Sequence, residues 1–353
     1  MNKERYIRQT LLDAIGEAGQ QKLLEAHIVV VGCGGLGSIA APYLAGAGVG
    51  RLTLIDGDFP HVSNLHRQVF FDNQSTQKTK AQVLADHIKR LNPEIKLTVV
   101  NTMLTKEKLM NNLLQANVLL ECTDNIQVKY MANDYCAVQQ IPMVYGAIHK
   151  YDGYVSFFEN KSVSSIHLRD IFAEPNDDIP SCSEVGVMGT LAGVIGLMQA
   201  NEAIKYITNA GKCLIDTLLT YNILHNEQMK LKLKKTFTKD MKLLFQQSSY
   251  IADQVCETYE CTIDQVMQNR MRYKVVSILE DHEHQDIDAA VNRMPLSEFE
   301  IEEWESTTEE ATVFYCMSGV RSGTLVNQLL LQSPDANVYS LRGGLRGFLE
   351  GKE

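Results

Sequence analysis

Six consecutive residues, Gly32-Cys-Gly-Gly-Leu-Gly37, have the spacing G-x-G-x-x-G. They follow a β-branched run at residues 27–31 and precede a small-residue segment at 38–47 that suits a helix. A second predicted strand, 51–55, ends on Asp56, about 20 positions after the last glycine. Such glycines let a backbone approach phosphate, the helix N-terminus favours an anion, and the acid can bind a ribose. The pattern predicts a nucleotide site rather than a structural turn, with these candidate residues: Gly32, Gly34, Gly35, Gly37 and Asp56.

Further charged residues lie at the ends of predicted elements. Asn64 and Arg67 belong to a polar stretch at 63–68, and Lys80 opens a predicted helix at 80–91. Asp124 follows a predicted strand at 118–121, and the carboxyl end of a parallel strand is where such sheets bind ligands. Arg8 precedes a helical segment predicted at 11–26. It is either a phosphate ligand or a solvated surface charge.

Two cysteines lie in settings that suit sulfur chemistry. Cys316 follows a predicted strand at 311–315 and opens a short loop before a predicted helix at 323–332. Backbone amides, the helix N-terminus and Arg321 would stabilise a thiolate or persulfide there, whereas the alternative is a buried strand-end cysteine. Cys182 lies in a polar, proline-containing segment. It suits a nucleophile, but an incidental cysteine explains it as well.

The elements that must position these residues alternate between strand and helix. This alternation predicts an α/β fold with a doubly wound, Rossmann-like, mostly parallel sheet, closed by an edge strand within 230–242. Periodicity fades through 246–249 and resumes near 261. We therefore predict a nucleotide-binding domain at 1–243, a linker at 244–259 and a smaller α/β domain at 260–353.

Composition limits the classes of protein that fit. The chain has 353 residues, room for two domains, and a net charge of −10, which argues against nucleic-acid and anionic-membrane surfaces. The N-terminus has no apolar signal core, and the longest apolar stretch, 185–198, is too short to span a bilayer. Eight cysteines are scattered without a C-x-x-C pair, so neither a disulfide framework nor a cysteine zinc site is indicated. We expect a cytoplasmic protein without nucleic-acid or membrane partners.

The motifs together resemble the ubiquitin-activating-enzyme superfamily, and within it the MoeB/ThiF-type adenylyltransferases that activate ubiquitin-like sulfur carriers. The resemblance covers the first ~240 residues. It is carried by Arg5-Tyr-x-Arg-Gln, the glycine turn, Leu-Thr-Leu-Ile-Asp56, Ser-Asn-Leu-His-Arg-Gln, Lys80, Cys-Thr-Asp-Asn and the run from Cys182 to Lys205. The C-terminal part looks like a rhodanese domain, through Cys316-x-x-Gly-x-Arg-Ser and the closing 338–348. The pairing resembles fused sulfur-carrier activators.

The resemblance implies a role for each candidate. The glycine turn would face the phosphates of ATP, and Asp56 would bind its ribose. Asn64, Arg67 and Lys80 would neutralise the triphosphate, and Asp124 would hold Mg²⁺. Arg8 would reach the site of a neighbouring subunit, which implies a homodimer.

The implied reaction begins with attack on ATP by the C-terminal Gly-Gly carboxylate of a ubiquitin-like sulfur carrier. This gives an acyl-adenylate and pyrophosphate, and the protein supplies placement and charge. Cys182 aligns with a loop cysteine that some relatives use covalently. Cys316 would carry a persulfide, loaded by a cysteine desulfurase or thiosulfate, and would yield a thiocarboxylate.

The chain departs from the family pattern at two places. Many relatives hold a structural zinc with two C-x-x-C pairs, whereas this chain has Ser164-Ser-Ile-His167 at the first pair's region and no cysteine at 232–240. We therefore expect no zinc. A rhodanese strand also usually ends in an Asp-x-Arg that braces the active loop, and residues 276–279 here read Val-Ser-Ile-Leu.

Other functions compete with sulfur-carrier adenylation. The same fold could adenylate another peptide or a small acid beside a degenerate C-terminal domain. A nicotinamide oxidoreductase would explain the glycine turn, but it has no need of Arg67, Lys80 and Asp124. A non-catalytic binding module is the last alternative. The pathway, whether molybdopterin, thiamin, tRNA thiolation or a specialised metabolite, stays open.

Overall fold

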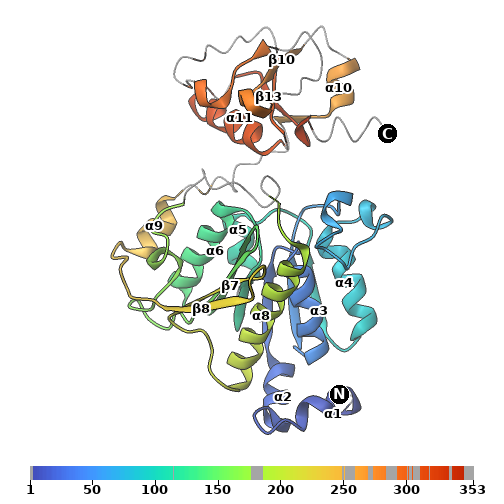
Figure 1. Ribbon diagram of the computed structural model, residues 1–353, viewed down its shortest axis with the longest axis vertical. Coiled ribbons are helices and arrows are strands. Elements are labelled where there is room, and N and C mark those ends of the chain that lie inside the picture. The colour runs from blue at the N-terminus through green and yellow to red at the C-terminus, as the bar shows by residue number, and fades with distance from the viewer. Residues whose placement is uncertain are drawn as a thin grey trace. The chain divides into compact units, whose positions relative to one another are not determined.

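The computed structural model describes residues 3–113, 115–175, 186–248, 250, 259–268, 273–283, 292–299, 301, 304, 311–317, 319–333 and 336–345. The chain divides into two compact units, Met1–Asp253 and Gln254–Glu353 (Figure 1). Each unit has its own sheet and its own hydrophobic core, so each is described by itself. No helix in the described ranges combines the length and apolar character needed to cross a membrane.

The first unit is built on an eight-stranded sheet in the order β3-β2-β1-β4-β5-β6-β7-β8. Its first five strands are parallel and the last three are added antiparallel, which confirms the mostly parallel, doubly wound fold. The strands are β1 (His27–Val31), β2 (Arg51–Ile55), β3 (Lys96–Val100), β4 (Val118–Glu121), β5 (Met143–His149), β6 (Asp152–Phe158), β7 (Thr217–Asn222) and β8 (Glu227–Lys232).

Helices cover both faces of this sheet (Figure 1). One face packs against α3 (Gly37–Ala47), α4 (Lys80–Leu91) and α8 (Gly189–Thr208), and the other against α5 (Lys106–Asn112), α6 (Ile126–Gln139) and α9 (Met241–Gln247). Successive residues of β1 point to opposite faces of the sheet. Val30 packs in the core on the α3 side, and Val29 and Val31 pack in the core on the α6 side. Burial on both faces explains why this strand reads as an unbroken β-branched run.

The N-terminal segment departs from the predicted helix at 11–26. It forms two helices, α1 (Lys3–Thr10) and α2 (Gly16–Glu25), with irregular chain between them. Gly16 opens α2 with a φ of +58°, a left-handed conformation that interrupts a continuous helix. Arg8 therefore lies on a helix and not ahead of one.

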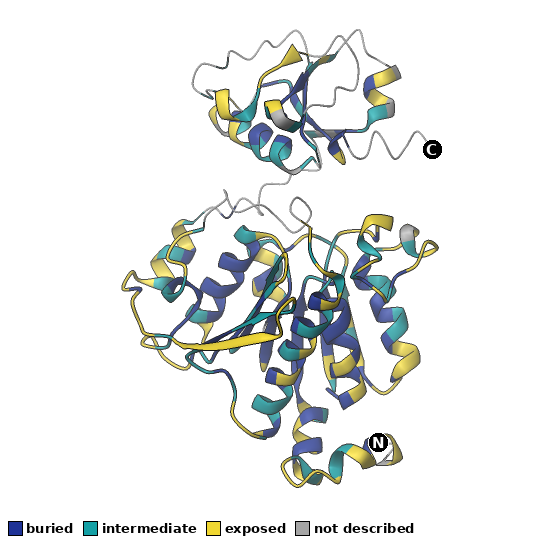
Figure 2. Ribbon diagram, in the orientation of Figure 1, coloured by how far each residue is buried: buried dark blue, intermediate teal, exposed yellow. Residues whose placement is uncertain are grey.

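The end of the first unit also differs from the prediction. Residues 241–247 form α9, and Phe245 packs against Tyr135 with 5.5 Å between ring centroids. Tyr250 is buried in the same core. Residues 244–248 and Tyr250 thus belong to the first unit and not to a linker that begins at 244, because Phe245 and Tyr250 pack in its core. The predicted edge strand is β8, which ends at Lys232 and is exposed along its whole length (Figure 2).

The second unit has a five-stranded parallel sheet in the order β11-β10-β12-β13-β9. Its strands are β9 (Glu260–Cys261), β10 (Tyr273–Ser277), β11 (Asn292–Arg293), β12 (Ala311–Tyr315) and β13 (Val338–Leu341). The described helices are α10 (Ile263–Gln268) and α11 (Val320–Gln332), with 3₁₀ turns η7 (Asp281–Glu283) and η8 (Leu296–Glu298). Phe314 packs edge-on against Phe299 and Trp304 in one of its two core clusters. This confirms a second, smaller α/β unit.

Candidate active site

The glycine turn joins β1 to α3 and folds back on itself. Gly32 has a φ of +86°, and a Cβ placed on it would lie 2.9 Å from the backbone carbonyl carbon of Cys122. A Cβ on Gly37 would lie only 1.9 Å from the Gly32 carbonyl oxygen. Side chains are excluded at both positions, so the turn stays narrow and its backbone can approach a ligand. The turn also abuts the loop after β4.

Asp56 ends β2 and lies directly beside this turn. Its Oδ2 accepts a hydrogen bond from the Cys33 amide at 2.7 Å, and its Oδ1 accepts one from the Asp58 amide at 2.8 Å. Burial raises the pKa of Asp56, and the Lys80 charge and the two amides oppose that effect. The carboxylate is held in one orientation, which suits a fixed acceptor for ribose hydroxyls.

Asn64 and Arg67 lie on and just after the 3₁₀ turn η1 (Val62–Asn64). The Asn64 carbonyl accepts the Arg67 amide at 3.0 Å, and the Arg67 guanidinium donates weakly to the Ser63 carbonyl at 3.4 Å. A Cβ on Gly35 would lie 3.7 Å from Arg67 Cδ, so the arginine stem crosses the glycine turn. Arg67 is half-buried and has no ion-pair partner in the described ranges.

Lys80 is the first residue of α4, whose N-cap Thr79 accepts the Gln82 amide at 3.2 Å. The lysine is 6% exposed, although its charge would favour water. Its ammonium pairs with the carboxylate of Asp58, and its backbone amide donates to the Asp58 carbonyl at 2.8 Å. Asp58 therefore holds Lys80 at the carboxyl end of β2.

Asp124 lies in the loop between β4 and α6. It is exposed, and its carboxylate has no hydrogen-bond or ion-pair partner within the part of the chain that the structure describes. The residues on either side of Asp124 are held by hydrogen bonds. The Thr123 amide donates to the carboxylate of the buried Glu121, and Asn125 caps α6 by accepting the Val128 amide at 3.0 Å. A free carboxylate on a fixed loop suits a hard divalent cation such as Mg²⁺.

The structure thus brings most of the predicted nucleotide site together at the carboxyl ends of β1, β2 and β4. The glycine turn touches Arg67 on one side and the Thr123 loop on the other. The buried Gln68 adds an amide oxygen without a hydrogen-bond partner beside Gly34. Two cations, one free carboxylate and the amides of a narrow glycine turn are the groups that a magnesium nucleoside triphosphate requires.

Arg8 lies elsewhere in its own chain. Helix α1 is attached to the C-terminal ends of α3 and α4, through Gln9 to the Ala47 carbonyl at 3.0 Å and Arg5 to the Leu91 carbonyl at 2.7 Å. In a doubly wound sheet those ends lie at the edge opposite the carboxyl ends of the strands. Arg8 is exposed and makes no hydrogen bond or ion pair with described residues. It does not join the site of its own chain.

Cys182 lies outside the described residues. The chain resumes at Gly186, and the Met188 amide then donates to the Lys150 carbonyl at 3.1 Å. A Cβ on Gly189 would lie 2.2 Å from the His66 carbonyl oxygen. The segment that follows Cys182 is therefore anchored beside the residues around Arg67.

Cys316 lies between β12 and α11 in the second unit and is fully buried. Its Sγ accepts a hydrogen bond from the Gly319 amide at 3.1 Å and a weaker one from Ser322 Oγ at 3.6 Å. Gly319, with a φ of +86°, caps α11, so the helix begins at Val320 and not at the predicted 323. An amide, a hydroxyl and a helix N-terminus around one sulfur favour its anionic form.

The guanidinium of Arg321 is paired with a carboxylate, although the sequence predicts that its charge acts on the Cys316 sulfur. Its guanidinium makes a two-point ion pair with Glu283 of η7, at 2.7 and 2.9 Å. The sequence motif alone gave no sign of this partner, which lies 38 positions away. Glu283 holds the loop arginine although the Asp-x-Arg brace is missing, and it balances the positive charge that the sulfur was expected to receive.

The two segments in which the sequence shows no zinc-binding cysteine pairs are joined by a hydrogen-bonded cluster. Asp170 accepts the amides of Thr236 and Phe237, each at 2.7 Å, and Lys235 Nζ at 3.1 Å. Lys235 Nζ also lies 2.8 Å from His167 Nε2. No group of three or more histidine, cysteine, aspartate or glutamate side chains is placed to hold a metal in the described ranges. The absence of zinc stays a prediction.

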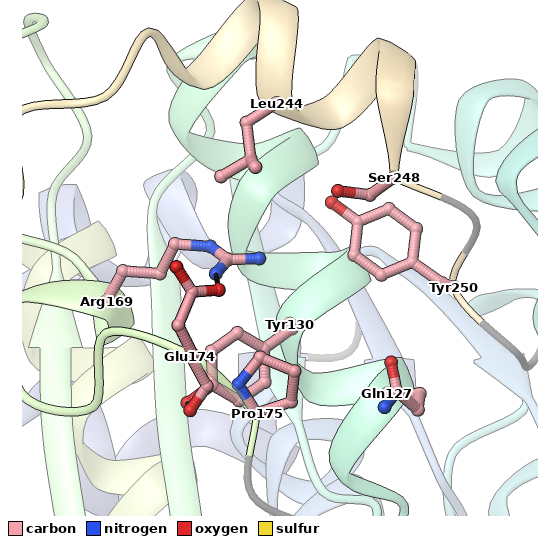
Figure 3. Close-up of a pocket in the computed structure, with 8 residues that line it drawn as sticks. All are labelled: Gln127, Tyr130, Arg169, Glu174, Pro175, Leu244, Ser248 and Tyr250. Carbon is pink, nitrogen blue, oxygen red and sulfur yellow. Dashed lines mark hydrogen bonds and ion pairs between the residues drawn. The ribbon is translucent and has the colours of Figure 1, made fainter.

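A cavity of about 240 Å³ lies apart from these residues, between α6, residues 169–175 and α9 (Figure 3). Its lining is Gln127, Tyr130, Arg169, Glu174, Pro175, Leu244, Ser248 and Tyr250, and it includes no predicted site residue. The Arg169 guanidinium binds Asp134 at 2.7 and 2.8 Å, the Ala173 carbonyl at 2.9 Å and Glu174 at 3.3 Å. Its donors are already engaged, so the cavity carries no ligand assignment.

Comparisons with known proteins agree with the geometry of the first unit. A model of the ThiF family matches residues 6–242. The sulfur carrier protein adenylyltransferase of Thermus thermophilus is 35% identical over 237 residues, 66% of this chain and 88% of that protein. A probable molybdopterin-synthase adenylyltransferase of Porphyra purpurea is 28% identical over 354 residues, 97% of this chain and 91% of that protein. The crystal structure of Escherichia coli MccB shares the fold, with a TM-score of 0.59, 19% identity, and coverage of 67% and 71%.

Proposed function

The chain belongs to the ThiF family, and on that premise we propose that it uses ATP to adenylate the C-terminal Gly-Gly carboxylate of a ubiquitin-like sulfur carrier. As an enzyme it is a nucleotidyltransferase, in line with its similarity to a sulfur carrier protein adenylyltransferase. One observation carries the proposal. The glycine turn, Arg67, Lys80 and the unpaired Asp124 carboxylate converge at one edge of the sheet, and a nicotinamide enzyme does not need such a set of charges.

In the proposed reaction, a carboxylate oxygen of the carrier attacks the α-phosphorus of ATP. The bond to the bridging oxygen breaks, and pyrophosphate leaves with the electron pair. The turn amides, Asn64, Arg67 and Lys80 would balance the charge on the phosphates, and Asp56 would fix the ribose. Nothing in this step needs a general base, because the nucleophile is already ionised. Placement and charge neutralisation supply the catalysis.

Asp124 is the proposed Mg²⁺ ligand, because its carboxylate is exposed and unpaired among the described residues. A bound Mg²⁺ would supply Lewis-acid polarisation of a phosphoryl oxygen. We propose no zinc requirement for the fold, since the Asp170–Lys235 ion pair already joins the two segments that a zinc would link.

We further propose a cytoplasmic homodimer in which Arg8 serves the site of the neighbouring subunit. The position of α1, beside the C-terminal ends of α3 and α4, supports this because it removes Arg8 from the site of its own chain. A free arginine near a second copy's triphosphate would add a third cation.

For the C-terminal unit we propose a rhodanese-like sulfurtransferase role. Cys316 would take a sulfane sulfur from thiosulfate or from a cysteine desulfurase. The terminal sulfur would attack the acyl carbon of the adenylated carrier, and AMP would leave. An external thiol would then cleave the S–S bond, which releases the thiocarboxylate and leaves a mixed disulfide on Cys316. Cys182 would form a covalent adduct with the carrier. The Gly319 amide and Ser322 hydroxyl at the sulfur support this role.

One observation favours a second candidate function. Because Glu283 neutralises Arg321, the C-terminal unit could serve only in binding, and the first unit could adenylate another peptide or a small acid. The pathway served by the carrier, molybdopterin or thiamin biosynthesis among them, is not distinguished by either unit.

ATP–pyrophosphate exchange separates these possibilities. We expect exchange with a ubiquitin-like carrier that ends in Gly-Gly and none with the same carrier lacking its last glycine. Exchange supported by an unrelated peptide or a small acid, and by no such carrier, would favour the second function. Exchange without any acceptor would contradict both.

A further inference from the structure

We propose that the buried Glu121 and Lys129, together with Thr123, position the loop carrying Asp124, and we call these three residues the loop anchor. The inference rests on the function proposed above, because it assigns these residues to the placement of the cation-binding carboxylate. They contact neither nucleotide nor acceptor in that proposal, so they are positioning residues.

Glu121 is the centre of the anchor. It is the last residue of β4, and its side chain is fully buried. Its Oε1 accepts the Thr123 amide at 2.9 Å and the Thr123 hydroxyl at 2.5 Å. Its Oε2 pairs with Lys129 Nζ at 2.5 Å. Both oxygens are thus committed to groups that flank Asp124 in the chain.

Lys129 holds the other side of the loop. It lies in the first turns of α6, and its side chain is 9% exposed. Besides Glu121, its ammonium donates to the Gly146 carbonyl at 3.0 Å and lies 5.3 Å from the centroid of the Tyr145 ring. Lys129 therefore ties α6 to the end of β4 and to the middle of β5. Asp124 lies between two fixed points, with its own carboxylate free.

The anchor is fixed in turn against the glycine turn. Gln199 of α8 is buried and donates to the Glu121 carbonyl at 2.7 Å and to the Val144 carbonyl at 3.3 Å. A Cβ on Gly32 would lie 2.9 Å from Thr123 Cγ2, so the loop and the turn are in close contact. A shift of Thr123 would change the distance between Asp124 and the phosphate-binding turn.

A buried ion pair is a poor device for stability alone, because desolvation offsets the attraction and apolar pairs of similar volume often serve as well. It does fix orientation, since both partners must meet in one geometry. A misplacement of about 1 Å in a positioned group can reduce a rate about 100-fold. The anchor is therefore expected to affect cation and nucleotide placement more than folding.

The test replaces both charges at once, by Glu121→Leu with Lys129→Met, so that no unpaired charge stays buried. Lys129→Arg in the native background keeps the charge and serves as the conservative variant. Glu202→Gln on α8 is the matched control. Glu202 is a buried carboxylate that pairs with Lys205 and accepts the Leu214 amide at 2.6 Å, away from the loop.

Three measurements apply to each purified variant: the unfolding temperature, the hydrogen exchange of the Thr123 amide without ligands, and the Mg²⁺ dependence of ATP binding by calorimetry. For the double variant we expect the Thr123 amide to exchange about tenfold faster. The Mg²⁺ concentration needed for half-maximal ATP binding should rise about tenfold or more. Lys129→Arg should keep both the amide exchange rate and the Mg²⁺ dependence close to those of the wild type. Glu202→Gln should lower the unfolding temperature alone.

Native Mg²⁺ dependence and native Thr123 protection in a folded double variant would overturn the proposal, and so would equal effects from Glu202→Gln. The two proposals fail in different ways. A wild type that binds ATP with Mg²⁺ but gives no exchange with a Gly-Gly carrier contradicts the proposed function, and the binding data still decide on the anchor. A wild type that binds no ATP contradicts both.

Discussion

Lys80 is buried at the start of a helix, yet its ammonium is met by Asp58, whose side chain is 63% exposed. A lysine held in this way needs little reorganisation to meet a triphosphate. We expect Lys80→Ala and Arg67→Ala each to lower kcat/KM for ATP–pyrophosphate exchange by about 100-fold or more, the size of losing one preorganised charge contact. The matched control is Lys78→Ala, because Lys78 forms an exposed ion pair with Asp86. Native rates in both site variants would refute the assignment.

Asp124 and Cys316 belong to different units, and their variants should separate the two half-reactions. Asp124→Ala is expected to abolish exchange, without rescue by added Mg²⁺, because the cation loses its proposed ligand. Cys316→Ala should keep exchange and lose thiosulfate-dependent sulfur transfer, since its Sγ accepts hydrogen bonds from Gly319 and Ser322 of the second unit and the proposed nucleotide site lies in the first. Mass spectrometry of the wild type after incubation with sulfur donors checks the persulfide. If none forms at Cys316, the sulfur-transfer proposal fails.

At the scale of elements, hydrogen bonds join residues 167–170 to residues 235–237. Burial and the Lys235 charge lower the pKa of His167 to about 4. Its neutral form is favoured in the folded state, so the unfolded chain takes up a proton first as the pH falls. His167 therefore contributes about 3 kcal/mol to the free energy of unfolding above its ordinary pKa of about 6.5. This contribution is lost as the pH falls toward 4.

Asp170 also contributes stability that is lost as the pH falls. Its pKa is lowered by three amides and His167 against the opposing effect of burial, so its contribution disappears below pH 4. We expect the free energy of unfolding in urea to fall between pH 7.5 and 4.5, and to fall less steeply in His167→Gln. The exposed His225 provides the control variant His225→Gln, with a native slope. Equal slopes in all three proteins would show that His167 is not the group responsible.

At the scale of the whole molecule, the proposed dimer makes a prediction that one chain cannot satisfy. Arg8 lies on α1, away from the site of its own subunit, so Arg8→Ala and Asp124→Ala would damage a site from different chains. Mixed subunits should recover part of the activity, because one site in each heterodimer would combine a native arginine with a native aspartate. Exchange assays on subunits mixed after mild denaturation measure the recovery. No recovery despite proven subunit exchange would place Arg8 outside the chemistry.

Local patterns in the sequence determined much of the first unit. The predicted bounds of β2 at 51–55, α4 at 80–91 and β4 at 118–121 agree with the structure. These elements were predictable because apolar period, capping residues and proline act within a few positions. The glycine turn and Asp56 belong to the same class, since one strand–turn–helix–strand unit places them together.

Only the tertiary structure decided which distant groups meet. Lys129 pairs with Glu121, Arg321 with Glu283, and Lys235 with Asp170, which lies 65 positions earlier in the chain. No periodicity encodes such pairs, because they depend on how layers pack. The same holds for Phe245 and Tyr250, whose burial extends the first unit past the predicted boundary at 243. The position of Arg8 also follows from packing, because α1 is held by the far ends of α3 and α4.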